Sequence, residues 1–302
     1  MPPKTLIVIA GPTAVGKTAL SVDIAKSLDA PVVSADSRQF FKEISIGTAK
    51  PTAEEMQNIP HYFIGSHSIT DDYNVGKYEA EVIPLLAELF KKHETIILTG
   101  GSGLYINAVC EGFDELPDAD IAIRQKIANI LKEKGVAGLS ELLEDLDPEY
   151  HSKADLSNPQ RLSRALEVCL STGKPYSSFR KGVKKKRDFE IIKIGLNIDR
   201  ETLYQRINRR VDQMMKVGLL DEAKNLLAQR NLNALQTVGY TELFEHLEGK
   251  FSLTEATEQI KQNTRNFAKR QLTWFRRDED MKWFEPGEKE RILQYIQEAT
   301  RV

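Results

Sequence analysis

The chain contains 302 residues, of which 41% are hydrophobic and 28% charged, the proportions of an ordinary globular protein with one large domain or two unequal ones. Its 42 basic residues nearly balance its 44 acidic ones, which excludes nucleic-acid binding through overall positive charge. Only local basic clusters could serve that role. No apolar run is long enough for a transmembrane helix and none is typical of a signal peptide, so we expect a cytoplasmic protein with no membrane partner.

The first apolar run, residues 6–10, predicts a buried strand because it is rich in β-branched residues. It leads directly into Gly11-Pro-Thr-Ala-Val-Gly16-Lys17-Thr18, which matches G-x-x-x-x-G-K-[ST], and a helical pattern follows to residue 28. A strand, this loop and a helix in that order are typical of a site for a di- or triphosphate, with backbone N–H groups pointing inward. Lys17 can reach phosphate oxygens, and the Thr18 hydroxyl can bind Mg²⁺.

A second predicted strand, residues 31–35, ends at Asp36-Ser37-Arg38-Gln39. Ligands of an open parallel sheet bind at the carboxyl ends of its strands, so we expect Asp36 on the same rim as the phosphate loop. A carboxylate at that place can hold a metal-bound water or act as a general base. The alternative is a turn or helix-capping residue without a chemical role.

A third predicted strand, residues 95–99, leads into a second glycine-rich turn, Gly100-Gly-Ser-Gly103. The backbone amides of this turn and the Ser102 hydroxyl could face the same phosphate or an acceptor substrate. Between the second and third strands, Thr52 and Glu55 have the spacing of a capping box at the start of a short helix.

Only helical patterns occupy the chain from residue 118 to about 187, with helices predicted at 121–135 and 159–172 and a short turn around 139–145. A strand returns at residues 190–198, so this block is an insertion in an α/β core. We therefore predict a core of residues 1–116 and 188–302 and a helical insertion domain of residues 117–187.

The second insertion helix begins at Asn158-Pro159, a cap followed by a proline in the first turn. Arg161 and Arg164 then share one side of the helix, opposite an apolar stripe. Such a pair is typical of a solvated face, and it also suits a helix that lies on a phosphate backbone.

The C-terminal part is predicted to be helical, at residues 202–217, 219–230, 239–248 and 254–275. In the first of these helices Arg206 and Arg210 are four residues apart and share a face. Two basic clusters stand out, residues 180–187 and residues 265–277, the second without an acidic residue. Each cluster alone would be a solvated face.

Taken together, these motifs resemble the tRNA dimethylallyltransferases, also called tRNA isopentenyltransferases. The phosphate loop is shared by many enzymes, whereas the later segments are particular to this family and occur in its order up to about residue 277. Besides the loop, the similar segments are Asp36–Gln39, Ile46–Pro51, Gly100–Tyr105, Arg164–Val168, Val238–Tyr240, Thr264–Gln271 and Thr273–Phe275. No cysteine follows Cys169, so the zinc finger of eukaryotic relatives is missing and a bacterial type is implied.

The resemblance implies a P-loop NTPase-like parallel sheet flanked by helices. The implied reaction is a Mg²⁺-dependent transfer of a dimethylallyl group from dimethylallyl diphosphate to the exocyclic N6 of the adenine adjacent to the anticodon in tRNA. The loop would hold the donor diphosphate through Gly11, Pro12, Thr13, Ala14, Val15, Gly16, Lys17 and Thr18, with Thr18 on the metal.

The implied catalytic residues are Asp36, Lys17, Ser102 and Arg210. Lys17 and Arg210 would neutralise charge on the leaving diphosphate, with Arg206 in support. Asp36 would accept a proton from the adenine amine or hydrogen-bond to it. Ser102 stands where the family usually has threonine and offers the same hydroxyl.

A base in a folded anticodon loop can reach a buried diphosphate only by leaving its stack, so we expect base flipping into a channel through the core. Gln39 could read a base edge, and the basic residues 181–187 and 265–277 would add phosphate contacts. A monomer is expected because one chain must clasp the RNA. The residues implied to contact tRNA are Asp36, Ser37, Arg38, Gln39, Ser102, Arg124, Gln160, Arg161, Leu162, Ser163 and Arg164.

Other interpretations stay open at this point. A P-loop phosphotransferase acting on a small molecule or nucleotide would turn over ATP and tolerate the loss of the C-terminal basic helices. An RNA-binding protein with a non-functional loop would keep its activity after Lys17→Ala. The adenylate isopentenyltransferases are similar over the core but act on free AMP, and residues 160–164 together with the basic C-terminal segment favour tRNA instead.

Overall fold

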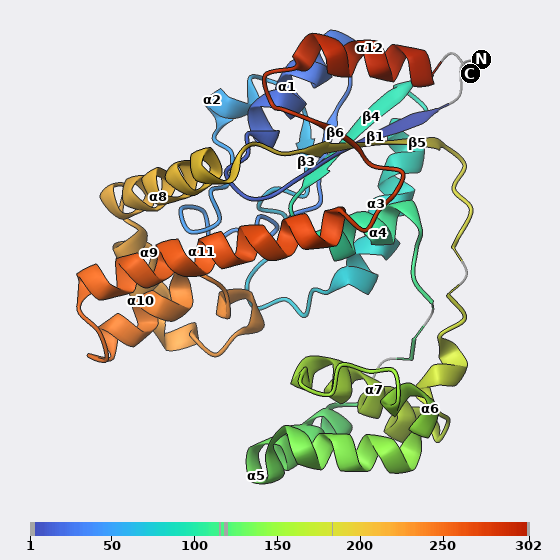
Figure 1. Ribbon diagram of the computed structural model, residues 1–302, viewed down its shortest axis with the longest axis vertical. Helices are drawn as coiled ribbons and strands as arrows, with labels where there is room; N and C mark the ends of the chain where they lie inside the picture. The colour runs from blue at the N-terminus through green and yellow to red at the C-terminus, as the bar shows by residue number, and fades with distance from the viewer. Residues whose placement is uncertain (1–3, 115, 118–119, 183, 301–302) are drawn as a thin grey trace. The chain divides into compact units, whose positions relative to one another are not determined.

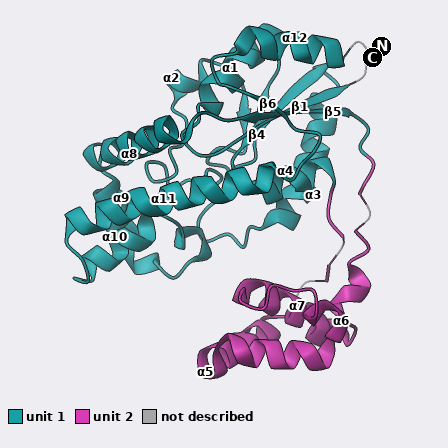
Figure 2. Ribbon diagram, viewed as in Figure 1, with its two compact units in different colours: residues 1–111, 187–302 teal, residues 112–186 magenta. Residues whose placement is uncertain are grey.

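The computed structural model describes residues 4–114, 116–117, 120–182 and 184–300 (Figure 1). Contacts within the chain divide it into unit 1, Met1–Glu111 with Arg187–Val302, and unit 2, Gly112–Lys186 (Figure 2). The helical insertion was predicted to span residues 117–187. Unit 2 begins five residues earlier, at Gly112, and ends at Lys186, so Arg187 belongs to unit 1.

Unit 1 contains a six-stranded sheet in the order β3-β2-β4-β1-β5-β6, and every neighbouring pair is parallel. The strands are β1 Thr5–Ala10, β2 Val32–Ser34, β3 His61–Tyr62, β4 Thr95–Gly100, β5 Glu190–Leu196 and β6 Lys282–Phe284. The predicted parallel α/β sheet is therefore confirmed. Because all strands run the same way, the loops after β1, β2 and β4 lie at one edge of the sheet.

Helices cover both faces of the sheet (Figure 1). Leu6 and Val8 of β1 pack in one core with α3 and α4, whereas Ile7 and Ile9 pack in a second core with α1 and α12, as the two-residue period of a strand requires. The helices of unit 1 are α1 Lys17–Leu28, α2 Ala53–Met56, α3 Val75–Leu89, α4 Gly103–Cys110, α8 Arg200–Lys216, α9 Leu219–Leu226, α10 Tyr240–Leu247, α11 Leu253–Phe275 and α12 Lys289–Ala299.

Unit 2 contains α5 Ile121–Leu146, α6 Pro148–His151 and α7 Pro159–Thr172, followed by a 3₁₀ helix at Tyr176–Phe179. The turn predicted around residues 139–145 is wrong, because α5 continues through them after a kink at Gly135, whose φ is 66°. Leu139 and Leu143, one helical turn apart, are fully buried against α7, and this packing holds the second half of α5.

Two predicted helix starts are confirmed by their side-chain caps. Thr52 and Glu55 form the reciprocal capping box at α2, and the Asn158 side chain accepts from the Arg161 N–H at the start of α7. Cys110 and Cys169 are buried free thiols. Among the described residues, no helix is both long and apolar enough to cross a bilayer.

Candidate functional site

The phosphate loop lies between the end of β1 and the start of α1. A Cβ on Gly11 would lie 2.7 Å from the Leu196 carbonyl oxygen, and Gly16 has a φ of 115°, so neither position tolerates a side chain without strain. The Lys17 ammonium folds back over the loop and donates to the carbonyls of Gly11 at 3.0 Å and Pro12 at 2.8 Å. Burial lowers the pKa of Lys17 to about 8, an effect that the Asp36 charge opposes and the Arg210 charge reinforces.

Two arginines of α8 converge on the same loop. Arg210 donates to the Thr13 hydroxyl at 3.3 Å, and Arg206 donates to the Val15 carbonyl at 3.1 Å. Burial lowers the pKa of Arg210, while the nearby Asp36 carboxylate raises it. The loop is therefore surrounded by three cationic side chains, an arrangement that suits a multiply charged anion.

Asp36 lies two residues after the end of β2 and has a structural role in the turn. Its Oδ1 accepts from the Arg38 N–H at 3.0 Å, which shapes the turn. Its charge raises the pKa of both Lys17 and Arg210, which places this carboxylate electrostatically among the loop cations. The turn interpretation of Asp36 is therefore confirmed, while its predicted chemical role stays a prediction.

Ser102 joins the turn after β4 to the end of β2. Its hydroxyl accepts from the Ser37 N–H at 3.0 Å and donates to the Ser37 hydroxyl at 3.1 Å. The two strand ends are in close contact, since a Cβ on Gly100 would lie 2.3 Å from the Ala35 carbonyl oxygen. The second glycine-rich turn thus lies beside the segment of Asp36, the carboxylate predicted to accept a proton from the adenine amine.

Arg38 and Gln39 are engaged by the protein itself. The Arg38 guanidinium donates to the carbonyls of Asn233 and Ala234 at 2.9 and 3.2 Å, so its predicted role in RNA contact competes with these bonds. The Gln39 amide nitrogen donates to the carbonyls of Thr48 and Ala49. Only the Gln39 carbonyl oxygen is therefore left to read a base edge.

Glu222 of α9 organises the loop that begins at residue 45, a role that no motif in the sequence predicts. Its carboxylate accepts from the N–H groups of three successive residues, 45 to 47, each at 2.9 Å, and from the Tyr240 hydroxyl. A Cβ on Gly47 would lie 2.6 Å from the Tyr240 ring. Glu222 and Tyr240 therefore fix the first residues of this loop.

The long helix α11 has two distinct sides. Gln271 is 6% exposed, and its amide bonds both the phosphate loop and the second glycine-rich turn, contacts that the sequence did not predict. Lys269 and Arg270 of the same helix are exposed, as are Arg276 and Arg277 just after its end. Helical periodicity indicates that position 271 is buried, but not what it touches.

Of the residues that the resemblance implies for tRNA contact and that belong to unit 2, all but Arg124 lie near the start of α7. Gln160 and Arg161 are exposed, and Ser163 and Arg164 are half-buried. Arg164 pairs with Glu167 at 3.0 Å, and Arg124 lies 4.0 Å from the same carboxylate. These residues are close together within the unit.

The side chains of two residues predicted to contact RNA, Leu162 and Arg187, are turned into the protein. Leu162 is fully buried in the core of unit 2, so its side chain has no surface to offer an RNA. Arg187, the last residue of the basic segment 181–187, has a side chain only 9% exposed, paired with Glu79 at 3.0 Å and donating to the Val109 carbonyl. It therefore stabilises unit 1 instead of facing phosphates.

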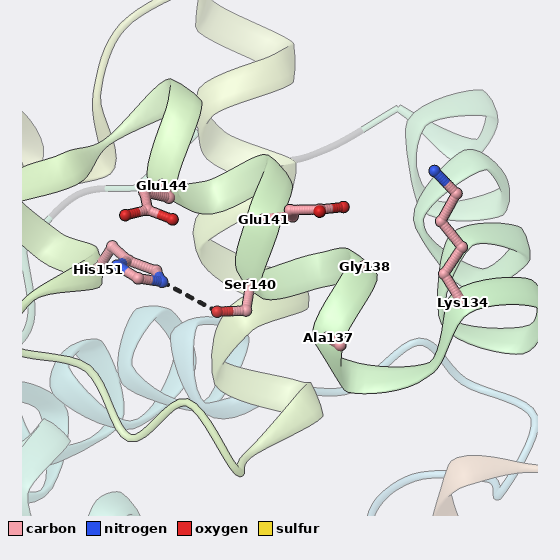
Figure 3. A pocket seen from close by; sticks show the side chains of 7 residues that line it. All are labelled: Lys134, Ala137, Gly138, Ser140, Glu141, Glu144 and His151. Carbon is pink, nitrogen blue, oxygen red and sulfur yellow. Dashed lines mark hydrogen bonds between the residues drawn. The ribbon is translucent and has the colours of Figure 1, made fainter.

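Unit 2 also contains a pocket of about 380 Å³, in which the Ser140 hydroxyl lies 2.9 Å from His151 Nε2 (Figure 3). It is lined by Lys134, Ala137, Gly138, Ser140, Glu141, Glu144 and His151, none of which is a predicted site residue. In the described part of the chain, no group of three or more His, Cys, Asp or Glu side chains is arranged to hold a metal ion.

The chain is similar to one family of proteins over most of its length. The family described as IPP transferase matches residues 39–278. The chain is 48% identical to tRNA dimethylallyltransferase 1 of Bacteroides fragilis over 301 residues, covering 100% of both chains. It is 52% identical to the tRNA dimethylallyltransferase of Christiangramia forsetii over 293 residues, covering 97% of each.

The chain is also similar to solved structures of tRNA-modifying transferases. The tRNA isopentenylpyrophosphate transferase from Bacillus halodurans is 37% identical, with a TM-score of 0.73, and the similarity covers 99% of this chain and 97% of that one. A eukaryotic dimethylallyltransferase acting on tRNA is 29% identical, with a TM-score of 0.74 over 90% of this chain and 69% of that one.

Proposed function

The chain belongs to the IPP transferase family, and from this premise we propose how its residues transfer a dimethylallyl group to adenine in tRNA. The enzyme is a tRNA prenyltransferase whose substrates are tRNA and dimethylallyl diphosphate. The finer assignment, to N6 of the adenine adjacent to the anticodon with release of diphosphate, is part of the proposal, as are the residue roles that follow.

The phosphate loop holds the diphosphate of the prenyl donor. The observation that carries this assignment is the convergence of Lys17, Arg206 and Arg210 on a loop whose glycines admit no side chain. When the allylic carbon–oxygen bond breaks, negative charge builds on the diphosphate, and fixed cations stabilise that charge. Diphosphate oxygens replace the two loop carbonyls that Lys17 contacts in this structure.

Mg²⁺ is proposed as the divalent metal of this tRNA prenyltransferase. The protein offers the Thr18 hydroxyl at the start of α1, with Asp36 the carboxylate at this rim, and no larger ligand group among the described residues. This set fits Mg²⁺, which keeps several waters and takes most other ligands from substrate phosphates. Bound there, the metal supplies further neutralisation of the leaving group.

Asp36 is proposed to receive the adenine amine. Its Oδ1 is fixed by the Arg38 N–H, and its Oδ2 has no hydrogen-bond partner among the described residues, which leaves that oxygen to accept a proton from the attacking nitrogen. Ser102, held by Ser37, places a hydroxyl beside the same centre. Flipping of the adenine out of the anticodon stack delivers it to these groups.

The tRNA is proposed to be held by both units. Arg124, Gln160, Arg161, Ser163 and Arg164 supply polar and basic contacts from unit 2, and the exposed basic side of α11 supplies phosphate contacts from unit 1. We propose a monomer, acting in the cytoplasm.

The test is a transfer assay with labelled dimethylallyl diphosphate and an anticodon stem-loop RNA, with and without Mg²⁺, and with AMP and ATP as competing substrates. We expect label on the RNA adenine only in the presence of Mg²⁺, and none with Lys17→Ala. Label on AMP would assign the protein to free-nucleotide prenyl transfer. ATP hydrolysis without any prenyl transfer would show that the loop serves a phosphotransferase.

A further inference from the structure

Gln271 is a buried amide on α11 whose two ends contact two different loops of the site. Its Oε1 accepts from the Thr13 N–H at 2.9 Å, and its Nε2 donates to the Gly101 carbonyl at 2.8 Å. The fit is close, since a Cβ on Gly101 would lie 2.3 Å from that nitrogen. Both functions of the amide are therefore satisfied by backbone groups more than 150 residues away in the chain.

These two bonds are part of a longer series. On the donor side, the Thr13 hydroxyl accepts from Arg210. On the acceptor side, Gly101 precedes Ser102, whose hydroxyl bonds the backbone and side chain of Ser37, the neighbour of Asp36. One hydrogen-bonded series thus joins the loop proposed to hold the diphosphate to the turn proposed to receive the adenine, and Gln271 is the link in its middle.

We propose that Gln271 is a positioning residue that fixes the distance between the donor carbon and the adenine amine. It does not touch either substrate; it acts through Thr13 and Gly101. Group transfer between two bound substrates requires the reacting atoms about 3–3.5 Å apart, and a shift of about 1 Å can lower the rate on the order of 100-fold. This inference rests on the donor and acceptor roles proposed above.

The bonding pattern explains why the residue is an amide. A hydrocarbon of similar length, as in Gln271→Met, fills the space but leaves the Thr13 N–H and the Gly101 carbonyl without partners. An ionised carboxylate, as in Gln271→Glu, accepts from Thr13 but repels the Gly101 carbonyl oxygen. A protonated carboxyl restores both bonds, because its O–H donates and its carbonyl oxygen accepts.

The test is steady-state kinetics of Gln271→Met and Gln271→Glu, normalised to the folded enzyme concentration by near-UV circular dichroism. For Gln271→Met we expect kcat to fall by about 10- to 100-fold, with KM for dimethylallyl diphosphate and for the RNA each changed less than about threefold. For Gln271→Glu we expect kcat relative to wild type to rise as the pH falls, because burial raises the pKa of the introduced carboxyl. Gln271→Met should show no such recovery.

The matched control is Asn263→Leu on the same helix. The Asn263 amide donates to Glu242 at 2.7 Å, so this substitution also removes an amide hydrogen bond of α11, but at a distance from both loops. We expect lower stability and an unchanged kcat. An unchanged kcat in folded Gln271→Met, or a change confined to one KM, would overturn the proposal. If Gln271→Met does not fold, the absence of pH recovery in Gln271→Glu does the same, and loss of transfer by wild type would instead count against the proposed function.

Discussion

The burial of Lys17 predicts that the donor binds together with a proton. Without ligand, desolvation holds the pKa of Lys17 at about 8. A bound diphosphate favours the ammonium and raises that pKa, so the site takes up a proton wherever the free amine is partly neutral. With a pKa of about 8, the uptake is about 0.1 proton at pH 7 and about 0.8 at pH 8.5.

The sign of the pH dependence follows from this shift. Below about pH 7 the ammonium is already formed, and affinity does not depend on its titration. Above about pH 8 each further pH unit weakens binding by up to tenfold, about 1.4 kcal/mol, until the pKa of the bound state is reached.

The assay is calorimetric titration of dimethylallyl diphosphate in two buffers of different ionisation enthalpy, at constant Mg²⁺ concentration. The donor has its own titrating oxygens, so the same measurement on Lys17→Arg, which stays charged, is subtracted. Equal proton uptake by the two proteins at pH 8.5 would refute the reasoning about Lys17.

Three further outcomes are expected. Asp36→Asn keeps an acceptor for the Arg38 N–H but cannot take a proton, so we expect single-turnover transfer to slow by about 10²- to 10⁴-fold, and a rate equal to wild type would exclude general base catalysis. Arg187→Met removes the buried ion pair with Glu79 and the bond to the Val109 carbonyl, and should destabilise the protein by about 3–5 kcal/mol in urea unfolding, while the salt dependence of RNA binding stays unchanged; a changed salt dependence would return Arg187 to the RNA contacts. Arg270→Gln, on the exposed side of α11, should lower the slope of log affinity against log salt concentration by about one, and an unchanged slope would remove this helix from the RNA interface.

The rim of the site was predictable because it depends on local patterns. The loop at residues 11–18 follows an apolar run, and Asp36 and Ser102 each follow another, so a parallel sheet places all three at one edge. The pairing of Arg206 and Arg210 on one helix face followed from their spacing.

Contacts between distant segments were not predictable in the same way. Arg38 bonds carbonyls almost 200 residues away, and Gln271 bonds the loops at Thr13 and Gly101, in the first half of the chain. The hydrophobic periodicity of a local segment does not reveal such contacts. The edge strands β3 and β6 were also missed, because strands of two and three residues are too short to show alternation.

In the second half of α5 a local sequence pattern led to a wrong prediction. Gly135 has a positive φ of 66° and a non-helical ψ of −164°, a backbone conformation open to glycine, and a turn was predicted shortly after it. The apolar residues Leu139 and Leu143 instead continue the helix, because burial against α7 compensates for the kink.

The central claim is that the phosphate loop holds the prenyl diphosphate and not a nucleotide. The most direct test is equilibrium binding of labelled dimethylallyl diphosphate in the presence of Mg²⁺ and excess ATP, to wild type, Lys17→Ala and Arg210→Ala. We predict one donor bound per wild-type chain, not displaced by ATP, and a loss of binding in both variants. Displacement of the donor by ATP, or donor binding that survives both substitutions, would contradict the claim.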